Sequence, residues 1–239
     1  VLDVKTGSGA FMKAEEDARA LAAEMVRIGN NAGRRTIAVI SDMDQPLGYA
    51  VGNALEVREA IDTLKGGGPS DFRELCLTLG TQMLLAGGKT QDPEEAQDML
   101  QKSIENGDAL RKLAQFVEAQ GGDARAVYDP GLLPHASLQL PLAAPVSGYV
   151  SHIACDEVGI CSLMLGGGRE TKDSQIDLSV GLVLQKKVGD YVEAGEVLAI
   201  LRANDESRSV QAGERFLKAC HIGTQAPEKR PFIKEVLTD

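Results

Sequence analysis

The amino-terminal part of the chain alternates short apolar runs with a helical pattern. Residues 1–4 and 36–40 are short runs rich in β-branched side chains, which predicts two buried strands. Between them, residues 29–33, with glycine at both ends, close a helix. The small and apolar residues at helical spacing are Ala18, Leu21, Ala22, Met25 and Ile28. This order predicts a βαβ unit whose two strands are parallel.

Residues 71–119 carry a second helical pattern, divided by helix-breaking residues. Pro93 suits the first turn of a helix, and Gly107 breaks the pattern again. The apolar positions fall into three sets: Leu75, Leu79 and Met83; Ala96, Met99, Leu100 and Ile104; Leu110, Leu113, Phe116 and Val117. The pattern predicts three packing helices, and it places no chemical motif on them.

The pattern changes after residue 128. Prolines space the segment 129–143, which is typical of a linker. Short alternating strands punctuated by glycine follow at 144–150 and 188–201. A last helix is predicted over residues 208–222, with an extended tail over 227–236.

These patterns together predict the fold class and the domains. We expect an α/β domain segment at 1–128, with a partly parallel sheet and helices. The linker at 129–143 leads from it to a small α+β module at 144–239.

The net charge of the chain indicates which kinds of partner it can bind. The chain has 35 acidic and 25 basic residues, a net charge of −10, which argues against a nucleic-acid surface because phosphate binding needs a concentrated positive field. A small anionic substrate in a local basic pocket remains compatible with this charge. No apolar run approaches the roughly 18 residues of a membrane span, and no signal peptide is visible. The first residue is not Met, so we expect a piece of a longer sequence.

Cysteine and histidine spacing gives no metal motif. The four cysteines form no CxxC pair, and only Cys220 and His221 are adjacent. Zinc is therefore not expected, and reduced cytosolic thiols are the default interpretation.

Residues 42–59 connect the second predicted strand to a helix. Ligands of open α/β sheets gather at the carboxyl ends of strands, where such a loop begins. Gly48 and Gly52 would let backbone groups approach a ligand without interference from a Cβ atom. An ordinary βα connection with a proline turn explains the spacing equally well.

Residues 5–11 form a glycine-rich turn after the first strand. The turn is too short for a dinucleotide or P-loop pattern, and acidic residues at 15–17 would repel a phosphate. Phe11 on this turn has two interpretations, because an aromatic ring there stacks on a ligand or fills the core.

The strands after residue 144 also resemble the biotinyl or lipoyl carrier fold, a barrel-sandwich hybrid. That fold places a Val-Gly-Asp-x-Val-x-x-Gly turn, found here at 188–195, opposite a lysine at an exposed hairpin tip. Lys172 lies between the two halves but lacks the Met neighbours of such a lysine. A non-catalytic carrier or structural binding module is therefore the alternative function.

Three motifs resemble the family of pyrimidine-nucleoside phosphorylase and thymidine phosphorylase. They occur in the family's order and span nearly the whole chain: residues 2–12 (LDVKTGSGAFM), 42–59 (DMDQPLGYAVGNALEVRE), and 166–169 (GGGR) with 176–181 (IDLSVG).

The resemblance implies an activity and an assembly. It implies a cytosolic pentosyltransferase of nucleoside salvage, which splits uridine, thymidine or deoxyuridine with inorganic phosphate into the free base and a pentose 1-phosphate. The family members are homodimers with a small helical domain and a large α/β domain.

The resemblance also implies site residues. Leu47 and Ala50 match positions whose backbone carbonyls bind a monovalent cation, expected to be K⁺, and Glu59 matches its carboxylate ligand. Phe11 matches a position that lines the pyrimidine pocket. No catalytic residue of the family falls in this portion.

The family's phosphate-binding and base-binding residues precede the counterpart of Val1. We therefore expect that these 239 residues are inactive alone, and that they need the missing amino-terminal segment, or a chain that supplies it.

Overall fold

The computed structural model, which describes residues 1–238, is a mixed α/β structure with three sheets. Its chain divides into two compact units. The first unit contains Val1–Met43, Ile61–Val127 and the residues from Pro231 onward, and the second contains Asp44–Ala60 and Tyr128–Arg230. These units are defined by which residues lie close together in space, and each is made of segments that alternate along the chain. They therefore do not test the domain limits expected from the sequence, which stay a prediction.

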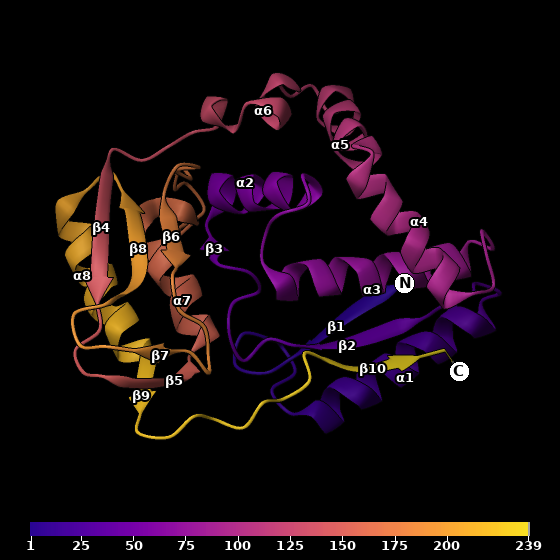
Figure 1. The fold of residues 1–239 in the computed structure, drawn as a ribbon, viewed down its shortest axis with the longest axis horizontal. Coiled ribbons are helices and arrows are strands. Elements are labelled where there is room, and N and C mark those ends of the chain that lie inside the picture. The colour runs from indigo at the N-terminus through magenta and orange to yellow at the C-terminus, as the bar shows by residue number, and fades with distance from the viewer. Residues whose placement is uncertain (239) are drawn as a thin grey trace. The chain divides into compact units, whose positions relative to one another are not determined.

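The sheet of the first unit contains the predicted βαβ arrangement. Strand β1 (Leu2–Thr6) pairs in parallel with β2 (Ala38–Asp42), and helix α1 (Glu15–Asn31) connects them, which confirms the prediction. The helix buries small side chains against one face of the sheet, and this cluster contains Val4, Ala18, Ala22, Val26, Ala38 and Ile40. Helix α3 (Ser70–Ala86) runs along the opposite face (Figure 1).

The expected carboxyl-terminal tail contains a strand. Residues Ile233–Leu237 form β10, which pairs antiparallel with β2 and completes the order β1-β2-β10. An ion pair of 3.0 Å joins the Lys234 Nζ to the Asp42 Oδ2, and both side chains are mostly buried. The short tail is therefore an integral part of the first sheet.

The three predicted helices are all present. After α3 come α4 (Pro93–Glu105) and α5 (Asp108–Ala119), followed by a short turn of helix, α6 (Arg125–Tyr128). The Asp92 carboxylate caps α4 by accepting from the Glu94 amide, and Pro93 occupies the first turn. Gly107, with a φ of +77°, separates α4 from α5.

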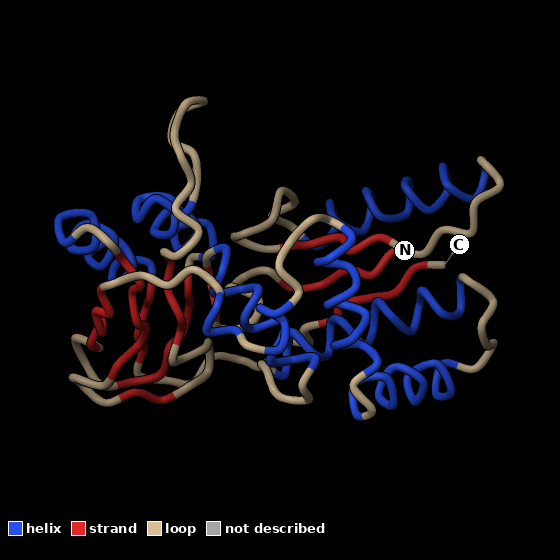
Figure 2. Tube along the Cα trace, turned by 90° about the horizontal axis from the view of Figure 1, so that it is seen from above, coloured by secondary structure: helices blue, strands red, loops and turns tan. Residues whose placement is uncertain are grey.

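The second unit contains two antiparallel sheets, shown in red in Figure 2. The larger has the order β3-β6-β8-β4, formed by Ala50–Val51, Gly181–Leu184, Val197–Ala203 and Leu138–Ala143. The smaller has the order β7-β5-β9, formed by Tyr191–Val192, Gly148–Ile153 and Cys220–Gly223. Neither sheet closes into a barrel within residues 1–238, and the barrel-sandwich likeness stays a prediction.

The segment expected to be a linker includes a strand. It begins with a short 3-10 turn (Pro130–Leu132) and ends in β4, which pairs antiparallel with β8. Leu138, Leu140 and Leu142 alternate along β4 and pack against the core. Because β4 is an edge strand, it tolerates Pro141, which has no amide hydrogen to donate.

Helices cover the second unit's sheets, and one was not expected. Helix α7 (Cys155–Ser162) continues into a π-helical turn (Leu163–Gly167), and α8 (Glu206–Ala219) packs beside α7. The helix expected over 208–222 ends early because residues from Cys220 form strand β9. Phe216, Val158, Leu182 and Leu201 are buried in the shared core.

Two further observations concern the described residues as a whole. No helix within residues 1–238 is long and apolar enough to cross a membrane. All four cysteines are free thiols, and three of them are buried.

The contact between β3 and β6 predicts a steep cost for one substitution. A Cβ on Gly181, whose φ is +150°, would lie 2.1 Å from the Val51 carbonyl oxygen. Gly195 has a φ of +89° but nothing within 4 Å of its Cβ position, so it is the matched control. In urea unfolding, we expect Gly195→Ala to cost about 1–2 kcal/mol from backbone strain. Gly181→Ala should cost about 1–3 kcal/mol more, because the strands must separate. Equal losses of stability would contradict this close approach.

Burial of the thiols predicts which cysteine reacts. Burial raises the pKa of Cys161 and of Cys220 to about 11, so at pH 8 only about one thiol in a thousand at either position is the reactive thiolate. Desolvation raises the pKa of Cys76 as well, but its side chain is exposed, so we expect iodoacetamide at pH 8 to label Cys76 first and to spare Cys161 and Cys220 until urea unfolds the chain. Mass spectrometry of the labelled peptides measures this, and fast labelling of Cys220 in the folded chain would contradict it.

Candidate functional site

The loop after β2 has the predicted course from strand to helix. Strand β2 ends at Asp42, and helix α2 (Asn53–Leu64) begins eleven positions later, after the two-residue strand β3. Gly48 has a φ of +66°, a left-handed conformation that glycine adopts without strain. Gly52 was expected to let the backbone approach a ligand. In the structure it lets the backbone approach the residue before β6, because a Cβ on Gly52 would lie 2.4 Å from the Val180 carbonyl oxygen.

Glu59 holds this loop from helix α2. Its Oε1 atom accepts from the Tyr49 amide at 2.9 Å and from the Ala50 amide at 3.0 Å. The side chain is half-buried. Hydrogen bonds to a carboxylate are among the stronger ones in proteins, so two from adjacent residues fix the end of the loop on the helix.

Strand β6 holds Tyr49 and Ala50 from the other side. Ala50 pairs antiparallel with Val183, and the neighbouring Leu184 amide donates to the Tyr49 carbonyl. In an antiparallel strand the amide and carbonyl of one residue point to the same edge. The Ala50 amide donates to Glu59, which places the backbone groups of Ala50 on the edge away from β6.

A lysine reaches the same loop from the turn between β6 and β7. The Lys187 ammonium donates to the carbonyls of Pro46 and Gly48, the second at 2.7 Å. Its Nζ lies 5.7 Å from the centre of the Tyr49 ring, within the range of a cation–π contact. Sequence reasoning did not find Lys187, because the residues it contacts lie 139 and 141 positions earlier.

The donor set of this loop fits one class of ion. Within residues 1–238 no group of three or more His, Cys, Asp or Glu side chains could hold a metal ion. Backbone carbonyls with a single carboxylate are instead oxygen ligands of the kind that large, weakly hydrated cations accept. Leu47 and Ala50 lie on the loop and Glu59 on the helix that follows, and the contact between them is the hydrogen bond from the Ala50 amide to Glu59.

Phe11 lies in the first unit, on the turn between β1 and α1. Its side chain is 93% exposed, so the interpretation that it fills the core is wrong. The turn itself is ordered by the Gly9 amide, which donates to the Met43 carbonyl at 2.9 Å, and by the Met43 amide, which donates to the Thr6 carbonyl. Met43, at the start of the second motif, therefore contacts the first motif at the carboxyl ends of the parallel strands β1 and β2.

The third motif contacts the start of helix α2. The Asn53 side-chain amide donates to the Gly167 carbonyl at 3.0 Å, and the Asp177 amide donates to the Gly166 carbonyl at 2.9 Å. Burial raises the pKa of Asp177, but hydrogen bonds from Ser179 and Asn204 lower it by more, so this carboxylate stays charged. The glycine run thus shapes a turn that holds the beginning of the helix.

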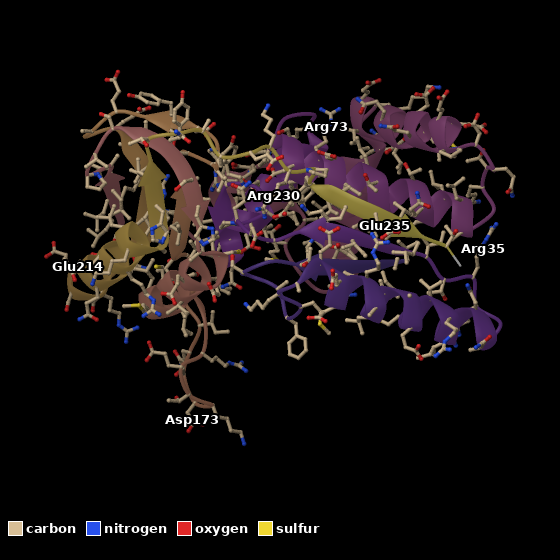
Figure 3. All side chains as sticks on the ribbon, turned by 90° about the horizontal axis from the view of Figure 1, so that it is seen from below. Arg35, Arg73, Asp173, Glu214, Arg230 and Glu235 are labelled. Atoms are coloured by element: carbon tan, nitrogen blue, oxygen red, sulfur yellow. The ribbon has the colours of Figure 1, made fainter. Side chains whose placement is uncertain are left out.

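Lys172, the lysine considered for a carrier function, is not among the residues that contact the start of helix α2. It is exposed on the loop between the glycine run and β6, next to Asp173, which Figure 3 shows at the tip of a projecting segment.

Comparison with protein families matches two parts of the chain. Residues 1–110 match the glycosyl transferase family a/b domain, and residues 149–223 match the pyrimidine nucleoside phosphorylase C-terminal domain. Each match lies where the corresponding motifs were found.

Curated relatives match most of the chain. A pyrimidine-nucleoside phosphorylase of Bacillus subtilis is 58% identical over 207 residues, 87% of this chain and 48% of the relative. Those of Geobacillus stearothermophilus and Staphylococcus haemolyticus are 58% and 57% identical, over 86% and 87% of this chain and 48% of each relative. The chain therefore spans about half the length of the curated relatives it matches. Both family matches and this identity show that the chain is similar to pyrimidine-nucleoside phosphorylases over most of its length.

Proposed function

We propose that this chain serves the phosphorolysis of pyrimidine nucleosides. Uridine, thymidine or deoxyuridine would react with inorganic phosphate to give the free base and ribose or deoxyribose 1-phosphate, in cytoplasmic nucleoside salvage. The observation that supports this most is 58% identity to a relative with the printed name pyrimidine-nucleoside phosphorylase.

In this reaction the protein must position phosphate and nucleoside and stabilise the charge that develops on the departing base. A phosphate oxygen attacks the anomeric carbon from the face opposite the base while the carbon–nitrogen bond breaks. The bonding electrons leave with the base, and the sugar has oxocarbenium character in the transition state. Alignment of the reactants and preorganised groups near the departing base account for most of the acceleration in such reactions.

This chain would contribute a cation site and part of the base pocket. The carbonyls of Leu47 and Ala50 with the Glu59 carboxylate would hold K⁺, which supplies fixed positive charge for an anionic co-substrate. The position of Glu59 beside the Ala50 amide supports this proposal. Phe11, exposed on a turn at the carboxyl end of β1, would line the pyrimidine pocket.

The remaining groups would come from outside these 239 residues. The phosphate-binding and base-binding residues belong to the segment that precedes the counterpart of Val1 in the family. We propose that the chain acts together with that segment in a homodimer, and that the carboxyl-terminal module keeps a barrel-sandwich likeness without carrying a prosthetic group.

The carrier alternative is not favoured. Residues 149–223 match the C-terminal domain of pyrimidine nucleoside phosphorylase, and they include Lys172. We therefore propose no function for Lys172 as an attachment site.

A fusion tests the proposed activity. The part of the Bacillus subtilis relative that precedes the counterpart of Val1 is joined to this chain. We expect the fusion to release uracil from uridine with a kcat on the order of 1 s⁻¹ or above, only when phosphate is present. The 239-residue chain alone should release none, because in the family the residues that hold phosphate and most of those that hold the base precede the counterpart of Val1. Release by the chain alone, or a folded fusion without phosphate-dependent release, would contradict the proposal.

A charge-neutral substitution tests the cation site in the same fusion. Glu59→Gln keeps an oxygen that accepts from the Tyr49 and Ala50 amides but removes the negative charge. We expect the K⁺ concentration for half-maximal activity to rise by about tenfold, equivalent to about 1.4 kcal/mol of binding free energy.

Glu56 provides the matched control for this substitution. Its Oε1 accepts from the Gly52 amide at 2.9 Å, one helical turn before Glu59. Glu56→Gln should leave the K⁺ requirement within about a factor of two, since one turn away its charge is more screened by solvent. An equal shift in both variants would argue for a general charge effect in place of a ligand.

A further inference from the structure

We propose that Lys187 is a positioning residue, which holds residues 45–50 in their carbonyl-lined shape before any metal ion binds. The proposal rests on the function proposed above, because it concerns the loop assigned there to the cation. Lys187 would act as a built-in cation that orders the loop, and the exchangeable ion would bind to the loop in that shape.

The contacts of Lys187 are specific to the loop. An ammonium has three donors and no acceptor, and two of its partners here are the carbonyls of Pro46 and Gly48. These two residues flank Leu47, whose carbonyl is a proposed metal ligand. The peptide unit that carries the Leu47 oxygen therefore lies between two peptide units whose oxygens are already bound.

One peptide unit is held from both ends by opposite charges. The peptide between Gly48 and Tyr49 accepts from the Lys187 ammonium at its oxygen and donates to the Glu59 carboxylate at its nitrogen. The chain contains no cis peptide bond within its described residues, so this oxygen and this hydrogen point in opposite directions. The Lys187 ammonium thus lies at the negative, oxygen end of this peptide dipole, and the Glu59 carboxylate lies at its positive, N–H end. Both interactions are favourable.

Neighbouring groups bring the ammonium to this position. The Leu184 amide donates to the Tyr49 carbonyl at 2.8 Å, and the Val188 amide donates to the Gln45 Oε1 at 2.9 Å. The loop is therefore attached to the 184–188 segment on both sides of Lys187. Of these three attachments, Lys187 supplies the one that carries charge.

Lys186 shows that the contact is not a general property of this turn. Its Nζ pairs with Glu196 and donates to the Tyr191 carbonyl at 3.2 Å, both within the carboxyl-terminal module. Two adjacent lysines in one turn thus have different partners: Lys186 contacts Glu196 and Tyr191, and Lys187 contacts the loop. Lys186 is therefore the matched control.

Amide hydrogen exchange measures the effect without any enzymatic assay. The Tyr49 and Ala50 amides report on the loop because both donate to Glu59. With choline as the only added monovalent cation, we expect Lys187→Met to speed exchange of these two amides by at least about tenfold. Lys187→Arg, which keeps the charge and the donors, should restore protection to within about threefold of the unmodified chain.

The controls separate positioning from general instability. Lys186→Met should leave the exchange of Tyr49 and Ala50 within about twofold of the unmodified chain. Amides of β8, in the core of the same unit, should exchange alike in all variants. If Lys187→Met does not fold, Lys187→Gln, which keeps a neutral donor, replaces it.

The outcomes distinguish this inference from the proposed cation site. Unchanged protection of Tyr49 and Ala50 in the Lys187 variant, or equal loss in the Lys186 variant, would overturn the positioning role. Addition of KCl to the fusion should protect Ala50 further, whichever residue is at position 187. If KCl has no effect while Lys187→Met still loosens the loop, the cation site fails and the positioning role stands.

Discussion

The candidate site depends on one carboxylate that accepts two adjacent backbone amides. Glu59 fixes Tyr49 and Ala50 to helix α2 through these two hydrogen bonds. The side chain proposed to bind a cation therefore also builds the surface on which the cation would rest. One carboxylate therefore has two effects here. It fixes the backbone of Tyr49 and Ala50, and its negative charge attracts a cation to the same loop.

The surroundings of this carboxylate come from distant parts of the sequence. Lys187 and the β6 strand approach the loop from one side, and the glycine run at 166–168 holds the start of α2 through Asn53. Gly52 and Gly181 let the backbones of β3 and β6 approach more closely than any side chain would permit. The carboxyl-terminal module is thus a structural support of the loop 44–60, which explains why these segments form one compact unit.

Periodic segments were predictable from sequence, and segments defined by distant pairing were not. The parallel pair β1 and β2 and helices α3, α4 and α5 follow from local spacing of apolar residues. Helix α7 was not predicted, because it lies between short strands that are separated by glycines. The buried residues Val158, Cys161 and Leu165 nevertheless have helical spacing. Phe11, Leu47, Ala50 and Glu59 were named from the family resemblance, whereas Lys187 was not, because its side chain acts across a long stretch of chain. No local pattern records such a contact.

Strand β10 has a consequence for how the protein is made. The sheet of the first unit uses β1 and β2 from the start of the sequence and β10 from its last described residues. Pairing across such a separation carries a high cost in loop entropy and slows folding. During synthesis on the ribosome, β2, which ends at Asp42, has no β10 neighbour until translation has passed Ile233–Leu237. Until then that edge of β2 is open, and an open strand edge is a site for chaperone binding or aggregation.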